Sequence, residues 1–326
     1  MCCLFGLIDY DNCLSVGQKR KIIKVLSKAA EDRGTDATGI SYNYNGKAVI
    51  YKRPLPAHKM NFRFKGNPKV IMGHTHLTTQ GSETINANNH PFLSEKLGFT
   101  LAHNGSLYND TELRYKEDLP KTNIQTDSYV AVQLIEKKNT LSFDSLKYMA
   151  EKVEGSFCFT VLDKNDSLYI VKGDNPMTIA EFNGYYIYAS TVEILRKTLI
   201  ILKLTNTGIV RISDGDILKI SSDGSISNST FKMDSFYSSW SNWTRTSRMA
   251  YWNEMVYTPT KAYSTKKKNE NSYLNDLINY GKYVGIDEDV ILELLDLGYD
   301  YGDIENMFYD PDYLQDVIDC DLCSEI

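Results

Sequence analysis

The stretch Met1-Cys2-Cys3-Leu4-Phe5-Gly6-Leu7-Ile8 opens the chain and decides how the rest is interpreted. A cysteine directly after the initiator methionine is small enough for that methionine to be removed, so Cys2 would begin the mature chain. It would then carry a thiol and a free α-amine on one Cα atom. The amine has an ordinary pKa of about 8 and can take the thiol proton, which leaves a strongly nucleophilic thiolate. The apolar run after it predicts a buried strand that holds this terminus inside the fold.

Composition limits the possible classes of protein. The 326 residues predict one large domain with a smaller one, or two domains, and a hydrophobic content of 42% is enough for a core. The net charge of −6 argues against a general nucleic-acid-binding surface. No long apolar run or secretory pattern is present, so neither a membrane span nor export is expected. Six cysteines without framework spacing predict free thiols in a reducing cytoplasm.

Hydrophobic periodicity predicts an α+β fold. Many strands joined by short turns favour two antiparallel sheets with helices on their outer faces, and Asn45-Gly46 is a hairpin signal between two such strands. Residues 208–213 and 216–221 are expected to form a final pair of strands. The other expected strands are 4–10, 39–44, 47–52, 70–77, 99–103, 156–162, 167–171, 177–182 and 185–189, and the expected helices are 18–33, 127–137, 142–153 and 191–202.

The character of the sequence changes near residue 236 and again near residue 272. We expect one domain over residues 2–235. Residues 236–271 are rich in Ser, Thr, Lys and aromatic residues without periodicity, which predicts a linker or an irregular wrap. Residues 272–326 are acidic and include helical apolar spacing between Val290 and Phe308, which predicts an acidic helical tail or a small docking module.

Two segments carry residue types that suit catalysis. His103-Asn104-Gly105 ends an expected strand, and an Asn amide with a Gly N–H group can form an oxyanion hole. An ordinary Asn-Gly turn is the alternative. Asp127 follows Thr126 at an expected helix start, where it would either cap the helix or bind a substrate ammonium group.

Three histidines raise the question of a metal. His74 and His76 share one face of an expected strand, and His90 comes next along the chain. No acidic residue or cysteine stands nearby at ligand spacing, and zinc needs three or four protein ligands. We therefore predict no metal site. The single pair Cys320-x-x-Cys323 is discounted for the same reason.

Together, these segments resemble the glutaminase domain of class II glutamine amidotransferases, which are N-terminal-nucleophile (Ntn) hydrolases. The resemblance covers roughly residues 2 to 220, in the family's order. It implies a four-layer αββα sandwich of two antiparallel sheets. The segments that carry it are Met1–Gly6, Arg33–Gly39, Gly73–Gly81, Asn88–Phe92, His103–Gly105, Thr126–Ser128, Glu154–Phe157 and Ala189-Ser190.

The resemblance also implies a mechanism. Cys2 would attack the side-chain amide of glutamine with its own α-amine as base, and Asn104 and Gly105 would stabilise the oxyanion. Asp127 would bind the α-ammonium group of the substrate, and the backbone near Thr79 and Gln80 would help to hold its α-carboxylate. The substrate-binding residues expected in all are Arg33, His76, Thr79, Gln80, His90 and Asp127.

One departure from the family concerns the α-carboxylate. The family grips it with an arginine, whereas this sequence has His76 at that position. Histidine is mostly neutral at pH 7 and offers one hydrogen bond, whereas arginine offers a permanent charge and a bidentate fork. The loss of such a pair costs about 1.5–3 kcal/mol, or roughly 10- to 150-fold in affinity. Either glutamine binds weakly, or Arg33 substitutes, or the substrate lacks a free α-carboxylate.

The sequence beyond residue 235 bears on the choice of partner. A complete amidotransferase joins this domain to a synthase, whereas that part of the sequence carries no phosphate-binding loop. We therefore expect a separate ammonia-accepting synthase chain in the cytoplasm, with no cofactor, no membrane and no direct nucleic-acid binding. One alternative is an Ntn amidase acting on a different amide. Another is a non-catalytic regulatory protein that binds a partner through its acidic tail, although the joint presence of Cys2, Asn104, Gly105 and Asp127 argues against it.

Overall fold

The computed structural model describes residues 2–233, 274, 278, 281–282, 286–296 and 304. Contacts divide the chain into two compact units, Met1–Val256 and Tyr257–Ile326. In the second unit, helix α8 spans Glu288–Asp296 and buries Ile291 and Leu294. The expected linker at residues 236–271 lies outside the described residues, as does most of the expected tail, so the domain boundaries stay a prediction.

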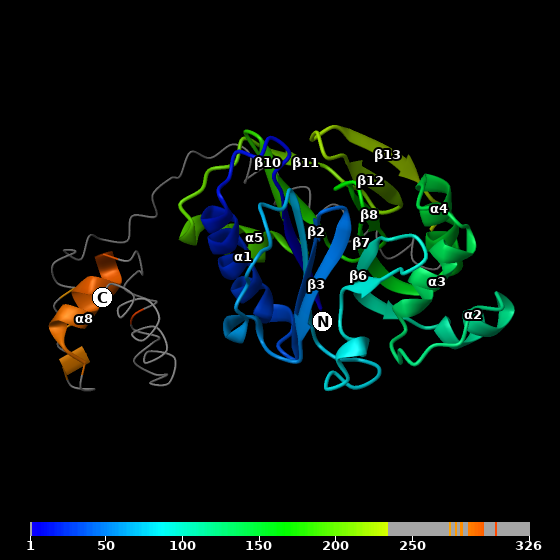
Figure 1. The fold of residues 1–326 in the computed structure, drawn as a ribbon, viewed down its shortest axis with the longest axis horizontal. Coiled ribbons are helices and arrows are strands. Elements are labelled where there is room, and N and C mark those ends of the chain that lie inside the picture. Colours follow the sequence, from blue (N-terminus) through cyan, green and yellow to red (C-terminus); the bar gives the residue numbers. More distant parts are fainter. Residues whose placement is uncertain are drawn as a thin grey trace. The chain divides into compact units, whose positions relative to one another are not determined.

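The first unit is built on two sheets in which every described strand pair is antiparallel (Figure 1). One sheet has the order β11-β9-β10-β1-β4-β2-β3 and the other the order β13-β12-β8-β7-β6-β5. The strands are β1 Cys3–Ile8, β2 Ala37–Tyr44, β3 Lys47–Arg53, β4 Val70–His76, β5 Phe92–Leu93, β6 Thr100–Leu107, β7 Gly155–Leu162, β8 Leu168–Lys172, β9 Thr178–Phe182, β10 Tyr185–Ala189, β11 Gly208–Val210, β12 Asp216–Ile220 and β13 Ile226–Thr230.

Helices cover the outer face of each sheet, so the layers run αββα as expected. Helices α1 and α5 pack on the seven-stranded sheet, and α3 and α4 pack on the six-stranded one. A third apolar cluster, which includes Leu4, Met72 and Ile170, fills the space between the two sheets. Within the described ranges, no helix has the length and apolar character needed to cross a membrane. The helices of this unit are α1 Val16–Ala30, α2 Asp110–Lys116, α3 Tyr129–Lys137, α4 Phe143–Lys152 and α5 Val192–Ile201.

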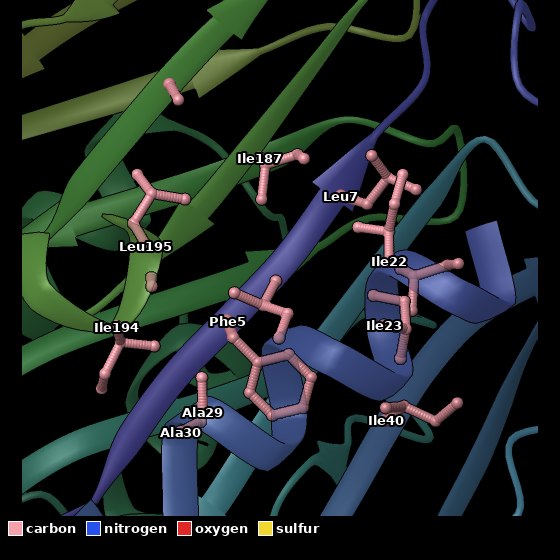
Figure 2. Close-up of a cluster of buried hydrophobic side chains, with 14 of the residues drawn as sticks. Phe5, Leu7, Ile22, Ile23, Ala29, Ala30, Ile40, Ile187, Ile194 and Leu195 are labelled. Carbon is pink, nitrogen blue, oxygen red and sulfur yellow. The ribbon is translucent and has the colours of Figure 1, made fainter. Parts of the chain in front are cut away.

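Strand β1 lies in the middle of the seven-stranded sheet, between β10 and β4. Because side chains alternate along a strand, Phe5 and Leu7 point toward α1 (Figure 2), whereas Leu4 and Ile8 point into the cluster between the sheets. Every residue of β1 is buried. The apolar opening of the chain therefore anchors Cys2 at the centre of the fold.

Long-range pairing decides the details that the sequence does not predict. Asn104 and Gly105 are expected to end a strand, but they lie inside β6, which pairs with β7 through Leu107. The two strands expected to form a final pair lie in different sheets, because β11 pairs with β9 and β12 pairs with β8. Helix α2 and strands β5 and β13 are not among the expected elements. The hairpin at Asn45-Gly46 is confirmed, and a second hairpin turns at Asn183-Gly184.

Candidate active site

Cys2 lies where the start of β1 meets the end of β4. Its Sγ atom accepts a hydrogen bond from the backbone N–H of Leu77 at 3.5 Å and lies 3.6 Å from the Leu77 carbonyl oxygen. Arg33, at the end of the short 3-10 helix Glu31–Arg33 that follows α1, donates from Nε to the Cys2 carbonyl oxygen at 2.8 Å. Only 6% of Cys2 is exposed. Cys2, the candidate nucleophile, is therefore held by hydrogen bonds from both Leu77 and Arg33.

The Cys2 thiol is kept protonated at neutral pH. Burial raises its pKa to about 11, and the negative charge of Asp127 acts in the same direction. The Leu77 N–H group, the positive chain terminus and Arg33 act in the opposite direction. Because the thiolate is scarce at pH 7, attack on a substrate needs a base beside the sulfur.

A pocket of about 260 Å³ lies next to two residues that contact Cys2, although Cys2 itself is not part of its lining. Two of its lining residues, Arg33 and Leu77, are the two that hydrogen bond to Cys2. Gly34 has to be small there, because a Cβ atom would come within 2.5 Å of the carbonyl carbon of His76. The complete lining is Glu31, Asp32, Arg33, Gly34, Thr35 and Leu77.

Asn104 and Gly105 occupy consecutive positions of β6. The Asn104 side-chain amide donates to Ser190 Oγ at 3.3 Å, and its backbone oxygen accepts from Asn175 Nδ2 at 2.8 Å. Gly105 has φ +147°, and a Cβ atom there would lie 1.9 Å from the Ser156 oxygen. Only glycine fits this conformation and contact, so the dipeptide is a strand feature rather than a turn.

Asp127 does not cap a helix. The residue at the N-cap of α3 is Ser128. Asp127 Oδ2 instead accepts from the backbone N–H of Leu107 at 2.6 Å, and Oδ1 accepts from Ser128 Oγ at 3.2 Å. The side chain is buried, and its charge acts on Cys2, His76 and His103. A buried carboxylate that acts on Cys2 suits recognition of an ammonium group.

His76 does not supply a positive charge at neutral pH. Burial lowers its pKa, although a hydrogen bond of 3.2 Å between Nδ1 and Asn89 Oδ1 and three nearby carboxylates oppose this. Arg33, which is half-buried at the pocket, carries a permanent charge next to Cys2. Of the two residues expected near a substrate carboxylate, Arg33 is the cationic one.

His90 belongs to a buried cluster of four imidazoles, together with His74, His76 and His103. Its ring centroid is 4.2 Å from that of His74, 5.4 Å from His76 and 6.5 Å from His103. Neither ring nitrogen of His90 has a hydrogen-bond partner. Burial lowers the pKa of all four, in the case of His103 to about 4. Among the described residues no group of His, Cys, Asp and Glu is arranged to hold a metal ion.

Thr79 and Gln80 lie exposed on the loop after β4. Asp36 ties this loop down, because its backbone N–H donates to the His76 oxygen at 2.9 Å and its Oδ2 accepts from the Thr78 N–H at 2.7 Å. In the sequence, Asp36 stands out only as part of a motif, without a role of its own.

The structure thus links most of the expected site residues. Hydrogen bonds or charges connect Cys2 with Arg33, Asp127 and, through Asp127, His76. His90 sits behind this group, and Thr79 and Gln80 lie on the loop beside it. Sequence reasoning assigns no role to three further contributors: Asp36, Ser190 and Asn175. Their only sequence signal is position within or near a motif, because their contacts are made across the fold.

Comparison with known proteins finds similar sequences. Residues 74–197 match the family model of the glutamine amidotransferase domain. Glutamine–fructose-6-phosphate aminotransferase (isomerizing) of Staphylococcus epidermidis is 30% identical over 200 residues, which are 58% of this chain and 32% of that protein. The Staphylococcus aureus protein of the same name is 27% identical over 237 residues, 69% of this chain and 38% of that one. The chain spans about a third of the length of these curated relatives.

Two solved structures share the fold. Glutamine phosphoribosylpyrophosphate amidotransferase from B. subtilis, complexed with ADP and GMP, matches with a TM-score of 0.54 and 19% identity, over 71% of this chain and 50% of that one. An allosteric regulatory enzyme of purine biosynthesis matches with a TM-score of 0.57 and 22% identity, over 71% and 49%. Residues 74–197 are therefore similar to a glutamine amidotransferase domain, and the chain shares its fold with these two enzymes.

Proposed function

We propose that this chain hydrolyses the side-chain amide of glutamine through a thioester on Cys2 and that the ammonia passes to a synthase on a separate chain. The observation that carries the proposal is the setting of Cys2. Its sulfur is held at the start of a central strand, in contact with Leu77 of the pocket lining, and within the electrostatic reach of Asp127 and Arg33.

The reaction is derived from the groups around Cys2. After removal of Met1, the α-amine takes the thiol proton and the sulfur forms a bond to the amide carbon. Asn104 Nδ2 and the Gly105 N–H stabilise the negative charge on the carbonyl oxygen. The C–N bond breaks as the α-ammonium group returns its proton to the leaving nitrogen, so ammonia departs. Water, deprotonated by the same amine, then hydrolyses the thioester to glutamate and the free thiol.

The α-amino and α-carboxyl groups of the substrate are held by opposite charges. Asp127 binds the α-ammonium group, and Arg33 binds the α-carboxylate together with backbone N–H groups near Thr79 and Gln80. His76 contributes a neutral wall, and His90 supports it through the ring contact behind it.

Four measurements test this proposal. Cys2→Ala should abolish hydrolysis while leaving the fold intact. A diazo-ketone analogue of glutamine should label the mature N-terminus, and intact mass should show that Met1 is absent. Asn104→Ala should lower kcat by about 10²- to 10³-fold with little change in KM. Labelling at Cys3, or an active Cys2→Ala variant, would refute the assigned nucleophile.

A second candidate, an amidase for a different amide, is favoured by the neutral His76. If the natural substrate lacks a free α-carboxylate, the wild type should prefer glutamine whose α-carboxyl group is blocked as an amide. His76→Arg should then lower activity on that substrate, because an unpaired guanidinium would be buried. A preference for free glutamine, with a lower KM in His76→Arg, supports the glutaminase.

The separate acceptor is tested with the purified chain. Glutamine should be converted to glutamate and free ammonia in equal amounts. Addition of fructose 6-phosphate should leave that ratio unchanged. Formation of an amino sugar would show that the chain uses its own ammonia.

A further inference from the structure

We propose that Ser190 is a positioning residue whose hydroxyl fixes the oxyanion donor Asn104 relative to the strand that carries Cys2. Ser190 stands between the end of β10 and Thr191, the N-cap of α5, and it is fully buried. The inference rests on the proposed function, because that function gives Asn104 its role at the oxyanion.

The Ser190 hydroxyl joins the two sheets next to the site. Its Oγ accepts from the backbone N–H of Leu4 at 2.8 Å and from Asn104 Nδ2 at 3.3 Å. The Ser190 N–H also donates to the Leu4 oxygen at 2.8 Å. Leu4 is two residues after Cys2 in β1, and Asn104 is in β6 of the other sheet. One atom therefore relates the position of the nucleophile strand to that of the oxyanion donor.

The hydrogen-bonding capacity of the two side chains fits this role. A hydroxyl has two acceptor lone pairs and one proton. Leu4 and Asn104 use the lone pairs. The remaining hydroxyl proton can point to the neighbouring Cys3 sulfur. Burial raises the pKa of Cys3 to about 11, and hydrogen bonds from Ser190 act to lower it, as this contact would. An Asn amide has two N–H donors, so the contact with Ser190 orients Asn104 and leaves its second N–H for the oxyanion.

The chain offers a matched control in Ser41, whose partner Thr100 lies on the same strand as Asn104. Ser41 Oγ and Thr100 Oγ1 lie 2.8 Å apart and join β2 of one sheet to β6 of the other. Both side chains are buried, as Ser190 is. Ser41→Ala therefore removes the same chemical group from the interface between the sheets without touching Asn104 or β1.

The experiment compares Ser190→Ala and Ser41→Ala in the wild-type and Asn104→Ala backgrounds. The readouts are kcat and KM for glutamine, with kcat counted per site titrated by the diazo-ketone analogue. We expect Ser190→Ala to lower kcat by about 10- to 100-fold, the scale of a small displacement of a catalytic group, with KM changed less than about twofold. Ser41→Ala should leave kcat near that of the wild type. In the Asn104→Ala background, the further loss from Ser190→Ala should shrink to less than about threefold, as expected for residues that act together.

An equal loss of kcat in both backgrounds would overturn the proposal, as would a loss that Ser41→Ala reproduces. If Ser190→Ala does not fold, Ser190→Thr keeps the hydroxyl and should keep kcat. A folded Ser190→Thr variant with low kcat would overturn the proposal. Failure of the proposed function has a different signature, because the wild type would then not hydrolyse glutamine or Cys2→Ala would remain active.

Discussion

The carboxylate of Asp127 accepts a 2.6 Å hydrogen bond from the backbone N–H of Leu107. Leu107 ends β6, the strand that contains Asn104, so the residue expected to bind the substrate ammonium group is tied to the strand expected to bind the oxyanion. In the proposed function, this strand would set the spacing between the α-ammonium group and the side-chain carbonyl of bound glutamine.

Asp127→Asn tests the charge while keeping an oxygen that can accept from Leu107. We expect KM for glutamine to rise by roughly 10- to 150-fold, the value of a hydrogen bond to a charged group. The control is Asp163→Asn, because Asp163 accepts backbone N–H groups of Asn165 and Ser167 in a surface turn. Steady-state kinetics should show an unchanged KM for the control. An Asp127→Asn variant that lost stability but kept its KM would make Asp127 a structural residue.

Arg33 and His76 can be separated by their charge. Arg33→Gln should raise KM for glutamine by roughly 10- to 150-fold, whereas His76→Gln should change it less than about threefold, because a neutral imidazole makes no ionic pair. KM should also stay constant between pH 7 and 8 as far as His76 is concerned, because burial lowers its pKa and the ring stays neutral over this range. A larger effect from His76→Gln than from Arg33→Gln would assign the carboxylate to His76.

The contrast among Asn-Gly pairs shows how far the sequence predicts the site. Asn45-Gly46 forms the expected hairpin, with positive φ at both residues. Asn104-Gly105 is the same dipeptide, but β7 pairs with it from about fifty residues away, opposite Cys158 and Phe157. Local preference favours a turn in both cases, and only the distant partner distinguishes them. The family resemblance singles out Asn104, whereas its contact with Ser190 depends on the complete fold.

The pH dependence of Cys2 alkylation tests the effect of burial on the thiol. In chains that retain Met1, as identified by mass spectrometry, the rate of Cys2 alkylation by iodoacetamide should rise about tenfold per pH unit from pH 8 to 10. The reason is that the pKa of the Cys2 thiol is about 11. Cys13→Ser removes an exposed competing thiol. The trimmed chain should react faster at pH 7, since its free α-amine adjoins the sulfur. A plateau below pH 9 in the untrimmed chain would contradict the raised pKa.

The buried histidines predict a loss of stability in acid. Burial lowers the pKa of His90 well below its ordinary value of 6.5, so the unfolded chain binds that proton more readily. The free energy of unfolding is therefore not reduced by His90 above pH 6.5, and it decreases as the pH falls below that value. His90→Leu removes a titrating ring whose nitrogens have no partner. Urea unfolding between pH 6 and 5 should show a slope smaller by up to about 1.4 kcal/mol per pH unit.

The exposed His58 provides the comparison for that measurement. The control variant is His58→Gln, at a histidine outside the buried cluster. If both variants changed the slope equally, the acid sensitivity would not originate in the buried cluster.

The central place of β1 has a consequence for the order of events during synthesis. Strand β1 is synthesised first, but it cannot complete its pairing until β10 has been made, because it lies between β4 and β10. At the usual 5–20 residues per second, ribosomes need about 10–40 s to pass from β1 to the end of β10. An aminopeptidase can reach the terminus during that interval, whereas the finished fold buries Cys2 to 6% exposure. The speed of translation thus sets how long the chain has to acquire its free amine.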